Sequence, residues 1–151
     1  MAETYVVTAS GVALVAATAK TVAEVTAGST VSARIISIDI TTKNGVTTQN
    51  SEMLVELVRY TTASTGTAFT PTRVNGESQN RASLCTAKTN DTVEPAGTVT
   101  VVKSWYVPST AGVIQQLPLG REVYLPPSTI IGVRCNAPQA QTVAVNIEFE
   151  E

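Results

Sequence analysis

The hydrophobic residues of this chain recur at every second position in several separate segments. In residues 142–149, the side chains of Val143, Val145, Ile147 and Phe149 fall on one side of an extended backbone. Successive side chains of a strand point to opposite faces of a sheet, so this segment predicts a strand that buries one face. The same period of two recurs in the segments 30–40, 52–61, 97–107 and 130–136. The pattern therefore predicts a chain built from β-strands.

Turn-forming residues separate these segments. Asn44-Gly45 follows the strand predicted over 30–40, and both residues tolerate the positive φ of a tight turn. Residues 72–96 are the least β-like part, and 81–87 has the composition of a single helical turn within a long crossover. Eight or more short strands without a fixed repeat predict an all-β fold. A jelly-roll-like two-sheet β-sandwich is the leading architecture, and a Greek-key barrel is the alternative.

The first sixteen residues form short β-prone stretches around Ser10-Gly11. We expect 1–16 to be an extended N-terminal arm or hairpin, followed by a single sandwich domain over 17–151. An unpaired strand edge tends to find a partner, so Tyr5, Val6 and Val7 are candidate interface residues. Residues 20–27 alternate weakly, which is typical of a bulge or an edge strand.

Composition and charge narrow the function. The chain has 151 residues, of which 43% are hydrophobic and 15% charged, and its formal net charge is −2. This composition favours one folded domain whose surface is partly covered in an assembly. The ten basic residues are dispersed, so neither nucleic acid nor a membrane surface is an expected partner. An acidic residue stands where a signal peptide needs positive charge, so we expect synthesis and retention in a cytosol.

The chain contains no histidine, the commonest general base and a frequent metal ligand. Glu52 and Glu56 share a strand face about 13 Å apart, farther than the usual carboxylate pair of glycoside hydrolases. Asp91 and Glu94 lie in a turn, where capping the loop is a simpler role than binding Ca²⁺, because no array of further ligands surrounds them. We therefore expect no enzyme activity, cofactor, metal or small-molecule substrate.

Cys85 and Cys135 are the two cysteines of the chain. A cytosolic chain keeps its thiols reduced, although the sequence leaves a bridge between them open. Without a histidine to lower the thiol pKa, a catalytic cysteine is disfavoured.

Basic and aromatic residues within the predicted strands are candidate contacts to a partner. Arg34, Arg59 and Arg134, together with Lys103, either extend over a solvated face or form ion pairs at an interface. Trp105 and Tyr106 are adjacent and so point to opposite faces, which makes one of them a candidate interface residue. The candidate interface residues within the domain are thus Arg34, Arg59, Trp105, Tyr106 and Arg134.

Three longer stretches carry a family resemblance. They are Val-Glu-Leu-Val-Arg-Tyr-Thr-Thr-Ala-Ser-Thr-Gly-Thr-Ala-Phe-Thr-Pro over 55–71, Leu-Pro-Leu-Gly-Arg-Glu over 117–122, and Ile-Gly-Val-Arg-Cys-Asn-Ala-Pro over 131–138. With the strand ending at 40 and the closing Glu150-Glu151, the chain resembles small jelly-roll proteins of tailed bacteriophages. Those proteins serve as capsid decoration (cement) or accessory head proteins. The resemblance covers most of the chain after about Ala17.

The resemblance implies a non-enzymatic virion protein that binds and stabilises an assembled capsid. Its expected partner is the major capsid protein on the capsid exterior, after assembly in the host cytoplasm. A homotrimer would match local threefold positions of a shell. Two other classes of function stay open from the sequence: a receptor- or glycan-binding module of a fibre or tail, and a small enzyme.

Overall fold

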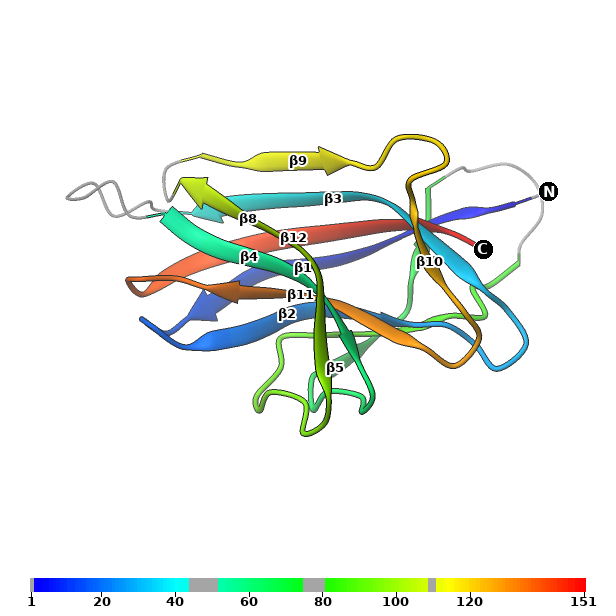
Figure 1. The fold of residues 1–151 in the computed structure, drawn as a ribbon, viewed down its shortest axis with the longest axis horizontal. Helices are drawn as coiled ribbons and strands as arrows, with labels where there is room; N and C mark the ends of the chain where they lie inside the picture. The colour runs from blue at the N-terminus through cyan, green and yellow to red at the C-terminus, as the bar shows by residue number, and fades with distance from the viewer. Residues whose placement is uncertain (1, 44–51, 75–80, 109–110) are drawn as a thin grey trace.

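The computed structural model describes residues 2–43, 52–74, 81–108 and 111–151, and all regular structure in these ranges is β (Figure 1). The Asn44-Gly45 turn lies outside the described residues. The strands are β1 Thr4–Leu14, β2 Ala19–Thr26, β3 Ala33–Lys43, β4 Glu52–Tyr60, β5 Thr67–Phe69, β6 Thr72–Arg73, β7 Thr86–Thr89, β8 Val99–Pro108, β9 Val113–Gln116, β10 Val123–Leu125, β11 Ile130–Asn136 and β12 Gln141–Glu150.

The strands form two antiparallel sheets that pack face to face. Sheet A has the order β10-β3-β12-β1-β6, with β9 also paired to β3, and sheet B has the order β5-β7-β2-β11-β4-β8. The strands β1 to β4 alternate between the two sheets, as do β10 to β12, and the first strand pairs with the last. This order confirms the predicted jelly-roll-like sandwich.

The first strand lies inside a sheet, so the structure corrects the expectation of a separate arm. β1 pairs with β12 along its length and with β6 on its other side. Tyr5, Val7 and Leu14 are buried in the core, and the Tyr5 ring stacks on Phe149 at a centroid distance of 5.8 Å. The register shifts between Ala9 and the next paired residue, so a bulge interrupts the alternation. This interruption makes one continuous strand resemble two short ones in the sequence.

Bulges interrupt the alternation of two other strands. In β3, Ser37 pairs with Glu148 while Ile35 pairs with Phe149, so Ile36 is an extra residue. Ile35 and Ile38 are therefore both buried, although strict alternation assigns them to opposite faces. The predicted irregularity in 20–27 is confirmed as a register shift in β2. That strand lies between β7 and β11, so the bulge interpretation holds and the edge-strand alternative does not.

The segment 72–96, which was predicted as a long crossover, also differs from its prediction. It lies within the connection from β4 to β8, and these two strands are neighbours in sheet B. Residues 81–87 form no helical turn; instead, β7 begins at Thr86. β5 and β7 extend sheet B beyond β2, and β6 extends sheet A beyond β1. The connection from β4 to β8 thus covers one lateral side of the sandwich. On the other side the sheets end at β8 and at β9 with β10 (Figure 1). We call this the β8–β10 side.

The core between the sheets is almost entirely aliphatic. Its largest fully buried side chains include Ile35, Met53, Leu57, Ile131 and Phe149. Removal of this apolar area from water is the main force that holds the two sheets together. The chain ends meet at one end of sheet A, where the backbones of Glu3 and Glu151 exchange two hydrogen bonds.

Candidate interaction surface

The ten-residue strand β8 is exposed along most of its length, although its sequence predicted a core strand. It pairs with β4 on one side only, and Val107 is its only fully buried residue. A register shift places Val102 as an extra residue beside Lys103. Bulges and lysines on an edge strand hinder the addition of another strand. We therefore expect a partner to contact the side chains of β8 rather than to continue its sheet.

Exposed apolar side chains concentrate on the β8–β10 side. Of the ten large apolar side chains that are exposed among the described residues, six lie between Val99 and Tyr124. They are Val99, Val101, Tyr106, Ile114, Leu119 and Tyr124. Tyr106 is 65% exposed, Ile114 71% and Leu119 97%. The strand registers place Tyr106 on the outer face of sheet B, and Ile114 and Tyr124 on the outer face of sheet A, so these side chains flank the β8–β10 side from both sheets. Exposed apolar and aromatic side chains are enriched at surfaces that contact another protein.

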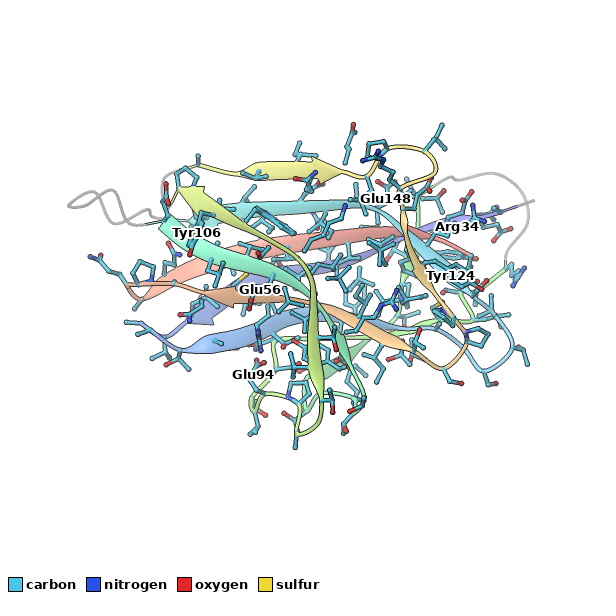
Figure 2. The ribbon with its side chains drawn as sticks, viewed as in Figure 1. Arg34, Glu56, Glu94, Tyr106, Tyr124 and Glu148 are labelled. Atoms are coloured by element: carbon cyan, nitrogen blue, oxygen red, sulfur yellow. The ribbon has the colours of Figure 1, made fainter. Side chains whose placement is uncertain are left out.

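Trp105 and Tyr106 point to opposite faces of β8, as their adjacency predicted. Trp105 lies opposite Val55 and packs against the core, with its indole N–H buried. Tyr106 lies opposite Leu54 and is mostly exposed (Figure 2). Tyr106 is thus the one of the pair that is available to a partner.

The three arginines have different surroundings. Arg34 is exposed on β3, opposite Tyr124 of β10. Arg59 is also exposed, and its guanidinium donates to the Tyr124 carbonyl at 2.7 Å, which links the two sheets. Arg134 is half-buried and donates to Glu56 from two nitrogens, at 2.8 and 2.9 Å. Arg34 and Arg59 adjoin the β8–β10 side, whereas Arg134 is engaged within the chain.

The three candidates in the first strand are separated by the alternation of β1. Tyr5 and Val7 are at most 1% exposed and fill the core, so they are not accessible to a partner in the folded chain. Val6 points to the other face of sheet A and is partly exposed. The alternation of the sequence was enough to separate the buried Tyr5 and Val7 from Val6, but the expectation of an arm treated all three as exposed.

Apart from the β8–β10 side, a group of acidic residues lies on the outer face of sheet B, under the loops 61–66 and 90–97 (Figure 2). Glu94 accepts hydrogen bonds from the backbone N–H and the hydroxyl of Thr21, so its predicted capping role is confirmed. Asp91 is buried beside it, and no backbone N–H donates to its carboxylate. The sequence analysis missed Glu24, which is 1% exposed; the available signal was a single acid between Ala23 and Val25 in a strand.

Within the ranges that the structure describes, no three His, Cys, Asp or Glu side chains are arranged to hold a metal ion. Glu56 is ion-paired, and Glu52 is exposed at the start of β4. A shallow hollow of about 290 Å³ on sheet A is lined mainly by small residues, with Lys43 at its rim.

Cys85 and Cys135 are both free and buried. Burial raises the pKa of each thiol to about 12. At neutral pH both are therefore uncharged core side chains, which makes them poor nucleophiles. The described part of the chain has no helix with the length and apolarity needed to cross a membrane.

Comparisons with known proteins give a limited result. No family model matches the chain, and no curated protein matches its sequence. Among solved structures, a chain of the T13 IBDV viral particle is 13% identical, with a TM-score of 0.26; the match covers 99% of this chain and 39% of that one. VP17, a capsid protein of bacteriophage P23-77, is 11% identical, with a TM-score of 0.23; coverage is 99% and 96%. Both similar structures come from viral capsids, but at these TM-scores they support no inference about this chain.

Proposed function

We propose that this chain is a non-enzymatic structural protein of a bacteriophage virion, which binds the outside of an assembled capsid and stabilises it. The observation that carries the proposal is the β8–β10 side, along whose two sheets lie six of the ten large apolar side chains that are exposed among the described residues. The resemblance of three sequence stretches to phage decoration proteins gives this surface its expected partner, the major capsid protein.

A decoration protein acts by mass action and needs no catalytic group. A protein that binds the assembled lattice and not the disrupted one shifts the equilibrium toward the lattice. The chain offers few charges for this contact, so apolar packing and hydrogen bonds dominate the proposed interface. Binding should therefore weaken only modestly as salt increases, in contrast to an interface that is formed by many ion pairs.

The proposal includes a homotrimer, since a threefold cluster fits the local threefold positions of a shell. Static light scattering at micromolar concentration tests it. A trimer has three times the mass of the 15.8 kDa chain. A monomer at this concentration contradicts the trimer while leaving capsid binding to be tested separately.

Capsid binding is tested with purified protein and empty heads of the encoding phage that lack it. Tyr106 and Ile114 are both replaced by Ser, because both are exposed on the β8–β10 side. The matched control is Val15→Ser, since Val15 is 66% exposed beyond the end of β1. We expect stoichiometric binding of the wild type in cryo-electron micrographs, unchanged binding of the control, and at least about tenfold weaker binding of the double variant, because central aromatic contacts dominate interfaces.

Two results contradict the proposal. If the wild-type protein ignores heads and binds the tail tip or a cell-surface glycan, a receptor-binding module is the correct function. If the double variant and the Val15 variant bind heads equally well, the β8–β10 side is not the docking surface.

A further inference from the structure

Three carboxylates lie together under the loops 61–66 and 90–97, on the outer face of sheet B. Glu24 comes from β2, whereas Asp91 and Glu94 come from the loop after β7. Glu24 and Asp91 are 1% and 2% exposed. Lys88 of β7 is the cation that acts on both of them, and its ammonium donates to the Ser64 carbonyl at 2.6 Å. When the three carboxylates and the Lys88 ammonium are all charged, this cluster carries more negative than positive charge.

Two of the carboxylates accept hydrogen bonds from backbone N–H groups, and the third accepts none of this kind. Both Glu24 oxygens accept from the Ser64 backbone N–H at 3.2 Å, and Glu94 accepts from Thr21. No backbone N–H reaches either oxygen of Asp91, and the Ser64 hydroxyl is the donor near enough to lower its pKa. A buried carboxylate with so few donors is destabilised in its charged form, so Asp91 is the member that gains most from a proton.

The same residues hold the two loops to the sheet and to each other. Glu24 holds the first loop through Ser64, and Glu94 holds the second through Thr21. The Thr65 hydroxyl accepts from the Val93 N–H at 3.0 Å and donates to its carbonyl at 3.1 Å. Asp91 lies against Gly66, where an added Cβ would clash with its Oδ1. Charge on Asp91 therefore acts directly where the loops meet.

We propose that the two loops form a proton-operated cover over β2, which closes when Asp91 is protonated and loosens when it is ionised. Ionisable groups face the cluster from each of the elements packed around it. They are Glu24 of β2, Tyr60 of β4, Lys88 of β7, Glu94 of the second loop, and Arg134 of β11, which is paired to Glu56 of β4. This inference does not depend on the proposed function.

The direction of the pH dependence follows from the burial. Burial chiefly, then Glu24 and Glu94, raises the Asp91 pKa from 3.8 to about 6, while Ser64 and Lys88 lower it. Burial likewise raises the Glu24 pKa. Because the folded-state pKa of Asp91 is raised, its contribution to closure is fully present below pH 3.8 and is lost as the pH rises toward about 6. The cover is thus tighter in acid than at neutral pH.

Hydrogen exchange on the purified protein tests the cover. Protection of the amides in 61–66 and 90–97 is measured at pH 5 and pH 7.5, corrected for intrinsic exchange, in the wild type, Asp91→Asn and the exposed control Glu52→Gln. The Asp91 pKa is 3.8 when the cover is open and about 6 when it is closed. From these two values, we expect the equilibrium constant for opening to be about tenfold larger at pH 7.5 than at pH 5, both in the wild type and in the control. We expect this pH dependence to disappear in Asp91→Asn, whose side chain is neutral at both pH values.

A second variant keeps the test decisive if Asp91→Asn does not fold. Lys88→Met removes the nearby cation, so the pH of half-loosening should move upward. The proposal is overturned if Asp91→Asn keeps the wild-type pH dependence or if Lys88→Met leaves the midpoint unchanged. It is also overturned if Ca²⁺ at pH 7.5 restores protection as fully as acid does, since the cluster then serves as a cation site.

Discussion

Replacing Val7 with Ala tests the placement of the first strand within sheet A. Val7 is fully buried between the sheets, whereas its neighbour Val6 is partly exposed on the outer face. The substitution removes two methyl groups, which are worth about 1.6 kcal/mol in transfer free energy at about 0.8 kcal/mol per buried carbon. A residual cavity adds to this cost, so we expect a loss of about 2–3 kcal/mol in the free energy of unfolding.

Val6→Ala is the matched control, because it makes the same chemical change in the same strand. Only the lower β-propensity of alanine and a little buried area contribute there, so the expected loss is below about 1 kcal/mol. Urea denaturation followed by tryptophan fluorescence measures both variants, with a midpoint shift on the order of 1 M for Val7→Ala. Equal midpoints for the two variants would refute the placement of β1, because a separate arm would leave the stability of the domain insensitive to both changes.

Two further predictions concern the thiols and the half-buried ion pair. Cys85 and Cys135 should react with a thiol reagent at pH 8 roughly a hundredfold more slowly in the native protein than in denaturant, because burial raises both pKa values. Fast native labelling, or a mass 2 Da below the reduced chain, would contradict this. A double-mutant cycle with Glu56→Gln and Arg134→Met should give a coupling free energy of about 1 kcal/mol, since the pair is short and shielded from solvent on both sides. A coupling of zero would mean that the pair does not contribute to stability.

The sequence by itself determined the strands whose alternation is uninterrupted. The predicted segment 130–136 is β11, and 142–149 differs from β12 by one residue at each end. In β12 the apolar residues from Val143 to Phe149 are buried, as their spacing predicted. Alternation is a local property, because backbone geometry alone places successive side chains on opposite faces. The division of Trp105 and Tyr106 between two faces was predictable for the same reason.

Tertiary structure decided which strands are neighbours, and with that the candidate sites. β8 has enough apolar residues for a core strand, yet none of the strands in the described residues covers its second edge. The bulge at Ile36 depends on pairing with β12, whose residues lie about a hundred positions away. Glu24 of β2 is buried where it meets Ser64 and Asp91, which come from two loops that are distant in the sequence. Periodicity reports how a strand is oriented but not what lies beside it, since pairing and burial arise from contacts between segments that are remote in sequence.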